Sequence, residues 1–89
     1  MKTVKLYTTS YCTYCDAAKR LLGGLGVPYE NVSLDGEDAL RAQLSADNRG
    51  WRTVPMIFIG DDFIGGFQEL KALNDKDQLL PQVGMKPKH

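Results

Sequence analysis

The chain of 89 residues has little of several features that mark particular classes of protein. Its eleven basic and eleven acidic residues cancel, and no block of one sign suggests a nucleic-acid-binding arm or an acidic tail. Its first residues, MKTVKLY, lack the apolar core of a secretory signal, and no apolar stretch approaches the roughly 18 residues of a membrane span. We therefore expect a monomeric cytoplasmic protein without a nucleic-acid or membrane partner.

Cysteine and histidine are also scarce, and their scarcity limits the roles of Cys12 and Cys15. A closed zinc site needs four ligands, but the only further soft ligand is His89 at the terminus, so we predict no metal site. Two cysteines are too few for a small domain held together by disulfides. In a reducing compartment, a close cysteine pair is more often catalytic than a permanent bridge. A reversible redox couple is the remaining interpretation.

Runs rich in β-branched and aromatic residues alternate along the chain with runs whose apolar residues recur at helical spacing. The predicted strands are residues 3–8, 29–34, 54–60 and 63–66. The predicted helices are residues 13–26 and 36–50, then one or two short helices within 67–83. Asp61 and Asp62 are expected to turn between the last two strands. The order β-α-β-α-β-β-α predicts an α/β fold with flanking helices and a small mixed four-stranded sheet, parallel where a helix crosses over and antiparallel at the hairpin.

One small domain is expected over residues 1–83, with residues 84–89 as a flexible tail because they are rich in lysine, proline and glycine. Trp51 is interpreted as a loop aromatic that packs over the second helix or forms a docking surface. The predicted core consists of Leu6, Leu21, Leu22, Val32, Leu40, Leu44, Ile57, Ile59, Leu70 and Leu73.

The cysteine pair falls where the first predicted strand gives way to the first helix. The first turn of a helix has unpaired backbone N–H groups and the positive end of the helix dipole, so a cysteine there is stabilised as a thiolate. Cys12 is therefore the expected nucleophile. Cys15 lies at i+3 on the same face and is expected to be buried and to resolve the mixed disulfide formed at Cys12. Lys19, one turn further on, receives no role.

Three motifs, YTTSYCTYC (residues 7–15), TVP (53–55) and IGG (64–66), stand in the order and at the spacing seen in glutaredoxins, which the chain resembles from Val4 to about Leu80. The resemblance implies a thioredoxin-like fold. It also implies a thiol-disulfide oxidoreductase that reduces protein disulfides or glutathione mixed disulfides. Glutathione would be its co-substrate, and no tightly bound cofactor is expected.

The resemblance gives the later motifs roles in binding. Pro55 would follow a cis peptide bond that places the Val54 backbone beside Cys12, where an extended substrate can pair with it. Gly65 and Gly66 would let the chain approach glutathione, whose γ-glutamyl carboxylate would meet the N-terminus of the next helix. The implied glutathione- and substrate-binding residues are Tyr14, Arg52, Thr53, Val54, Pro55, Gly65, Gly66, Phe67 and Gln68.

Three departures from the family pattern leave alternatives open. Thr9 stands where the family often has lysine, Phe67 and Gln68 replace a common Cys-Asp or Cys-Ser pair, and Thr13 replaces the usual proline. Gly66-Phe67 resembles redoxins that serve ribonucleotide reductase and take electrons from a flavoprotein of the thioredoxin-reductase type. Thr13 permits a further reading, a [2Fe-2S] cluster held between two protomers by the first cysteine of each and two glutathiones.

Overall fold

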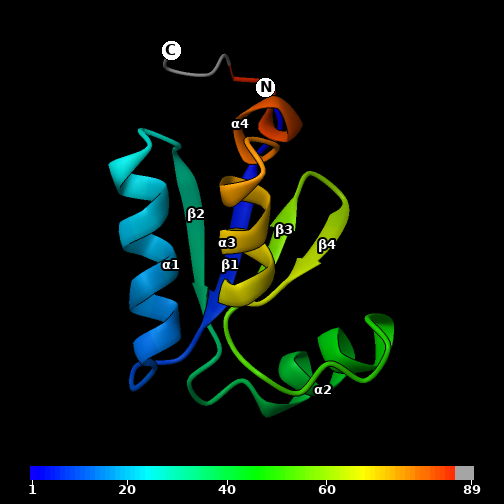
Figure 1. Ribbon diagram of the computed structural model, residues 1–89. Coiled ribbons are helices and arrows are strands. Elements are labelled where there is room, and N and C mark those ends of the chain that lie inside the picture. The colour runs from blue at the N-terminus through cyan, green and yellow to red at the C-terminus, as the bar shows by residue number, and fades with distance from the viewer. Residues whose placement is uncertain (86–89) are drawn as a thin grey trace.

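The computed structural model describes residues 1–85 and has the predicted order of elements, with two short helices at the end (Figure 1). The elements are β1 (Val4–Thr8), α1 (Thr13–Gly24), β2 (Tyr29–Ser33), α2 (Asp38–Asp47), β3 (Met56–Ile59), β4 (Asp62–Gly65), α3 (Phe67–Asp75) and α4 (Leu79–Val83). None of these helices is long and apolar enough to cross a membrane.

The four strands form one mixed sheet in the order β2-β1-β3-β4. β1 and β2 are parallel, as predicted for strands joined by a crossover helix, whereas β3 is antiparallel to both β1 and β4. β3 follows α2 but runs opposite to β2, because α2 does not cross over the sheet. α2 lies beyond the end of the sheet where β2 finishes, so that the chain re-enters the sheet from that end (Figure 1).

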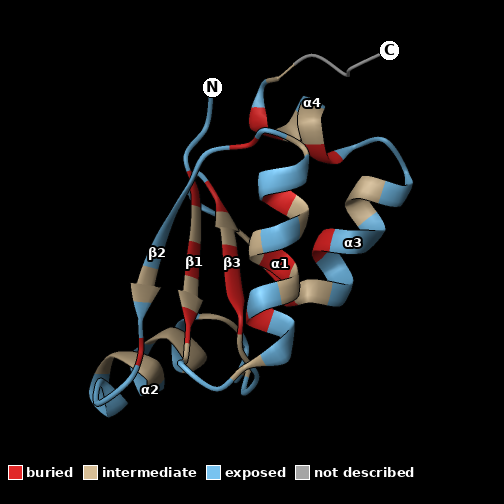
Figure 2. Cartoon of the chain, turned by 90° about the vertical axis from the view of Figure 1, so that its left-hand side faces the viewer, coloured by how far each residue is buried: buried red, intermediate tan, exposed pale blue. Residues whose placement is uncertain are grey.

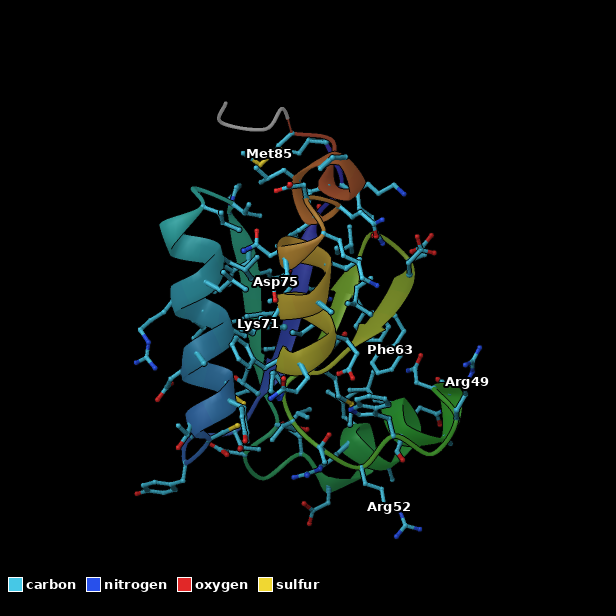
Figure 3. All side chains as sticks on the ribbon, in the orientation of Figure 1. Arg49, Arg52, Phe63, Lys71, Asp75 and Met85 are labelled. Carbon is cyan, nitrogen blue, oxygen red and sulfur yellow. The ribbon has the colours of Figure 1, made fainter. Side chains whose placement is uncertain are left out.

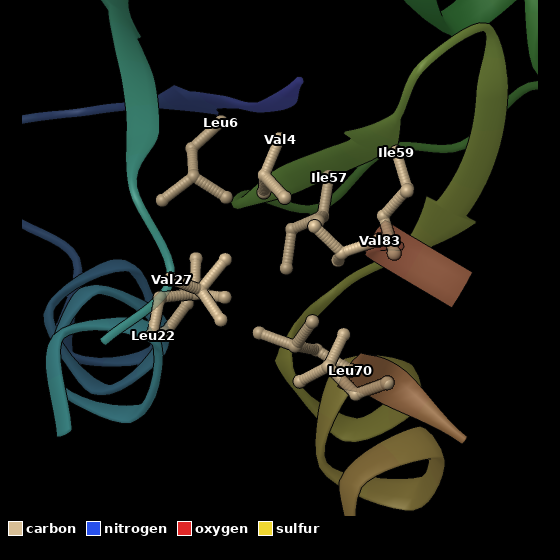
Figure 4. Packing of buried hydrophobic residues seen from close by; sticks show 10 residues of the cluster. Val4, Leu6, Leu22, Val27, Ile57, Ile59, Leu70 and Val83 are labelled. Atoms are coloured by element: carbon tan, nitrogen blue, oxygen red, sulfur yellow. The ribbon is translucent and has the colours of Figure 1, made fainter. Parts of the chain in front are cut away.

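α1 and α3 cover one face of the sheet, and the core lies between them and the strands (Figure 2). Alternate residues of β1 point inward, so Val4, Leu6 and Thr8 are buried, as the two-residue period of a strand requires. Figure 4 shows side chains of β1, α1, β3, α3 and α4 meeting in this layer. The buried hydrophobic cluster consists of Val4, Leu6, Ala18, Leu22, Val27, Ile57, Ile59, Leu70, Leu79 and Val83.

Helix α2 contributes less to the core than its sequence pattern predicts. Leu40 and Leu44 are only half-buried, and α2 has no fully buried residue, because the helix lies off the end of the sheet, away from α1 and α3 (Figure 2). Leu21, Val32 and Leu73 are also half-buried. Leu21 and Leu73 pack against the edge of the buried cluster. Periodicity therefore identified the inward faces of these elements, but the depth of burial depends on where each element lies.

The hairpin turn is one residue earlier than predicted. Ile59 pairs with Asp62, so Gly60 and Asp61 form the turn and Asp62 begins β4. Gly60 has φ of 59°, which is the conformation that the first position of a two-residue type II′ turn requires and that glycine adopts without steric cost.

The end of the described chain is folded onto the domain. The backbone N–H of Gly84 donates to Leu80 and Pro81, and Met85 is half-buried against the core. Residues 86–89 of the predicted tail lie outside the described residues.

Candidate functional site

The cysteine pair lies at the N-terminus of α1, at the carboxyl end of β1. Cys12 is the N-cap of the helix, and the backbone N–H of Cys15 donates to the Cys12 sulfur across 3.1 Å. Cys12 is half-exposed, Cys15 is fully buried, and both are free thiols. A negative charge on the Cys12 sulfur would therefore meet a donated hydrogen bond and the positive end of the helix dipole.

The two thiols have different environments. Burial, followed by the hydrogen bond with Cys12, raises the pKa of Cys15 to about 12, while the backbone of Thr9 and the charge of Lys19 act in the opposite direction. Lys19, which was expected to have no role, contributes the smallest of these effects on the pKa of Cys15. At neutral pH Cys15 is protonated as well as buried, so Cys12 is the sulfur of the pair that a substrate can reach.

A second segment approaches Cys12 from the loop before β3. The Val54–Pro55 peptide bond is cis, as the resemblance implied, and the Cys12 thiol donates to the carbonyl oxygen of Val54 at 3.5 Å. Pro55 is buried, whereas Thr53 is exposed. The structure thus brings residues 12 and 54 together although 42 positions separate them in the chain.

A groove opens beside these segments, and three of its eight lining residues are aromatic. Tyr14, which is 57% exposed, stacks on Phe67 with ring centroids 6.2 Å apart, and this pair joins α1 to α3 across the groove. Six of the predicted binding residues line the groove together with two others, and the eight residues are Tyr14, Trp51, Thr53, Val54, Gly66, Phe67, Gln68 and Glu69.

Trp51 and Glu69 line the groove, although neither was among the predicted binding residues. The Trp51 ring packs edge-on against Phe63 of β4 at 5.3 Å, rather than serving only as a cover for α2. A carboxylate oxygen of Glu69 accepts from the backbone N–H of Gly66 at 2.8 Å. A Glu at the third helical position commonly caps the start of its own helix, and this spacing was the available signal for Glu69.

Three of the predicted residues lie outside the groove lining: Pro55, Gly65 and Arg52. Gly65 is buried with φ of 122°, at the bend between β4 and α3. The Arg52 side chain extends away from the domain in Figure 3. Its backbone carbonyl accepts from the Arg41 guanidinium at 3.1 Å, and Arg52 lines a neighbouring depression with Arg41 and Asp38.

Among residues 1–85, no group of three or more His, Cys, Asp or Glu side chains is arranged to hold a metal ion.

The sequence model of the glutaredoxin family matches residues 4–64 of the chain. The chain belongs to the glutaredoxin family. It is 43% identical to a glutaredoxin of Pseudomonas aeruginosa over 79 residues, which cover 89% of this chain and 93% of the relative. It is 40% identical to glutaredoxin 3 of Escherichia coli K12 over 81 residues, which cover 91% of this chain and 96% of the relative.

Solved glutaredoxin structures also resemble this fold. The buckwheat glutaredoxin–glutathione complex superposes with a TM-score of 0.88 at 34% identity and covers 93% of this chain and 77% of that one. The holo form of poplar glutaredoxin C1 gives a TM-score of 0.86 at 33% identity, covering 91% and 75%. The glutaredoxin has the thioredoxin-like fold predicted for it and is a thiol-disulfide oxidoreductase. Glutaredoxins use glutathione as a co-substrate.

Proposed function

We propose that this glutaredoxin reduces protein disulfides and glutathione mixed disulfides through a Cys12–Cys15 dithiol couple, with glutathione as the reductant. The observation that carries the proposal is the asymmetry of the pair. Cys12 is accessible and accepts a hydrogen bond from the Cys15 backbone, whereas Cys15 is buried and has a pKa raised to about 12. One sulfur is suited to attack from solvent and the other to act only within the protein.

In the first step, the Cys12 thiolate attacks one sulfur of the substrate disulfide. A Cys12–substrate disulfide forms, the substrate S–S bond breaks, and the second substrate sulfur leaves as a thiolate and takes up a proton from water. The N–H of Cys15 stabilises the attacking charge at 3.1 Å. The Val54 carbonyl beside the Cys12 sulfur belongs to a loop whose backbone can pair with an extended substrate.

In the second step, Cys15 gives its proton to solvent and attacks the Cys12 sulfur. The Cys12–Cys15 disulfide forms and the remaining substrate thiolate leaves, so the substrate has gained two electrons and two protons. Two glutathione molecules then reduce the protein disulfide and become one glutathione disulfide. Direct attack of glutathione on a Cys12–glutathione disulfide would complete the cycle without Cys15.

The groove beside Cys12 is the proposed binding site for glutathione. The first turn of α3, at Phe67 and Gln68, offers backbone N–H groups to a carboxylate, while the stacked rings of Tyr14 and Phe67 line the groove. Gln68 lies in the groove without the acidic group that would hold the glutathione ammonium, so this contact is proposed as the weak part of the site. The Val54 backbone would serve both glutathione and extended protein substrates.

A coupled assay tests the electron donor. The oxidised protein is offered glutathione with glutathione reductase in one cuvette and thioredoxin reductase in another, and NADPH consumption is followed in both. We expect consumption in the glutathione cuvette, with Cys12→Ser as the inactive control. Efficient turnover with thioredoxin reductase alone would contradict the proposal. The protein would then be a redoxin reduced by a flavoprotein, a class whose Gly-Phe pair resembles Gly66-Phe67. A coloured protein with iron and sulfide would indicate cluster binding instead.

A further inference from the structure

A polar contact joins the loop that carries Cys12 to the loop after β2. Ser10 follows β1, and Asp35 follows β2, at the shared carboxyl end of these two parallel strands. The backbone N–H of Ser10 donates to one carboxylate oxygen of Asp35 at 3.1 Å, and the Ser10 hydroxyl donates to the other. The Asp35 backbone N–H in turn donates to the Ser33 hydroxyl at 3.2 Å.

This contact fixes the loop between β1 and Cys12 at a position beyond the last backbone hydrogen bond between the two strands. Beyond the β1–β2 pairing, one further backbone bond runs from the Leu34 N–H to the Thr8 carbonyl at 2.7 Å. Ser10 comes two residues later and two residues before Cys12. The loop is therefore fixed near its middle by Asp35 and at its far end by the contacts of Cys12 with Val54 and Cys15.

We propose that Asp35 is a positioning residue for the Cys12–Cys15 couple, which acts by holding Ser10 and so fixing the loop that carries Cys12 over the first turn of α1. Asp35 is exposed, and its carboxylate accepts hydrogen bonds from Ser10, so its role is not that of a core residue. The inference rests on the proposed dithiol function and adds to it a residue from outside the groove.

The charge state of Asp35 agrees with this role. The hydrogen bonds from the Ser10 hydroxyl and backbone hold the pKa of the Asp35 carboxyl below its usual range, so the ionised form, which accepts both bonds, is present at neutral pH. Thr9, the residue next to Ser10, is the one whose backbone lowers the pKa of Cys15. The segment that Asp35 holds therefore includes the Thr9 backbone, which interacts with the Cys15 thiol, and leads directly to Cys12.

The step most sensitive to this positioning is the second one. The Cys15 thiolate must attack the Cys12 sulfur of the mixed disulfide, form the internal disulfide and expel the substrate thiolate, which takes up a proton. Holding the loop keeps the two sulfurs at high effective concentration. A loop released from Asp35 samples more conformations, so closing the internal disulfide must first order it.

The test uses Asp35→Ala in the full chain. Equilibration with a dithiothreitol redox buffer gives the equilibrium constant for the Cys12–Cys15 disulfide, which we expect to fall about twofold to fivefold, the range for exposed charged contacts. Release of a coloured thiol from a mixed disulfide preformed on Cys12 should slow by a similar factor. The first attack of Cys12 on a small disulfide should change much less, because it uses the backbone N–H of Cys15 on α1 but not the Cys15 thiol.

Three further variants make the test specific. Ser10→Ala should give part of the effect, and the double variant should be no worse than Asp35→Ala, because both residues act through one contact. Asp35→Asn keeps an acceptor for the Ser10 N–H and should restore part of the equilibrium constant. Asp75→Ala is the control, since it removes an exposed carboxylate that binds Lys71 at 2.8 Å on α3, away from the loop (Figure 3).

The outcomes separate this inference from the proposed function. An unchanged equilibrium constant and release rate in Asp35→Ala, with a wild-type protein that does form the internal disulfide, would overturn the positioning role alone. Equal slowing of both chemical steps together with a lower melting temperature would reduce Asp35 to a stabilising residue. A wild-type protein that forms no Cys12–Cys15 disulfide at any buffer ratio would overturn the dithiol mechanism, and the role of Asp35 with it.

Discussion

The backbone N–H of Cys15 donates to the sulfur of Cys12 across 3.1 Å, so the proposed resolving residue supports the proposed nucleophile through its main chain while its own thiol stays buried. Both proposed roles follow from one local feature, a helix whose N-cap is a cysteine. The i+3 spacing puts the second sulfur one turn further in, on the face that α1 turns toward the core.

The first prediction concerns the order of reaction of the two thiols. Iodoacetamide at mildly acidic pH should label Cys12 well before Cys15, because Cys12 is accessible and lies at the helix N-terminus. Cys12→Ser should abolish disulfide reduction. Cys15→Ser should keep part of the activity toward glutathione mixed disulfides and accumulate adducts with larger substrates. Mass spectrometry of the labelled peptides shows which cysteine reacts first. Labelling of Cys15 before Cys12 would reverse the assigned roles.

The second prediction concerns stability at alkaline pH. The unfolded chain releases the Cys15 proton near pH 9.0, whereas the folded protein keeps it to about pH 12. Above pH 9 the unfolded state therefore binds fewer protons, and the free energy of unfolding should fall as the pH rises. Below pH 9 the Cys15 thiol is protonated in both states, so its contribution to the free energy of unfolding should not vary with pH.

Urea unfolding at a series of pH values measures this effect. Cys15→Ala is the control, because it lacks the thiol and should show a shallower decline above pH 9 than the reduced wild type. The oxidised protein should behave like the control for the same reason. Parallel slopes in all three proteins would mean that Cys15 does not keep its proton in the folded state.

The third prediction concerns the bend before α3. Gly65→Ala should lower the free energy of unfolding by about 1–3 kcal/mol, because Gly65 has φ of 122° and a Cβ atom would lie 2.8 Å from Cγ of Glu69. Gly23→Ala on α1 is the matched control. Nothing lies within 4 Å of its added methyl group, so this change should raise stability by about 0.5–1 kcal/mol. Equal urea midpoints for the two variants would contradict the strain argument.

The fourth prediction concerns the weak end of the proposed glutathione site. Gln68→Asp should lower the Michaelis constant for a glutathione mixed disulfide roughly threefold by supplying a carboxylate for the ammonium group at an exposed position. Thr9→Lys should add its own effect, because it would address the opposite end of the tripeptide. Gln68→Asn shortens the side chain without adding charge and is the control. The alkylation rate of Cys12 should stay the same in all variants.

The fifth prediction concerns Arg52. If its flexible side chain turns to meet the glycyl carboxylate of glutathione, Arg52→Ala should raise the Michaelis constant for a glutathionylated substrate by about twofold to fivefold, as expected for an exposed charged contact. Cys12 alkylation should not change. Arg20→Ala removes a similar exposed charge from α1 and is the control. Equal Michaelis constants for the wild type and Arg52→Ala would remove Arg52 from the site.

Much of the architecture of this glutaredoxin could be predicted from its amino-acid sequence. The order of strands and helices, the position of Cys12 at a strand–helix junction and the inward face of α1 all followed from patterns within a few residues of one another. These three features were predictable because hydrophobic periodicity and helix-end chemistry are local properties of a chain. The resemblance of the TVP and IGG motifs to those of glutaredoxins indicated the two other segments of the candidate site.

How segments far apart in the chain meet could not be predicted from local patterns and is set by the folded arrangement. It turned β3 antiparallel to β1, left α2 without a buried residue, brought Trp51 and Glu69 into the groove, and joined Ser10 to Asp35 across 25 positions. Each of these results depends on strand pairing and on where a helix lies relative to the sheet. A local pattern records which side of an element is apolar, but the neighbour that covers that side is set by contacts between residues far apart in the chain.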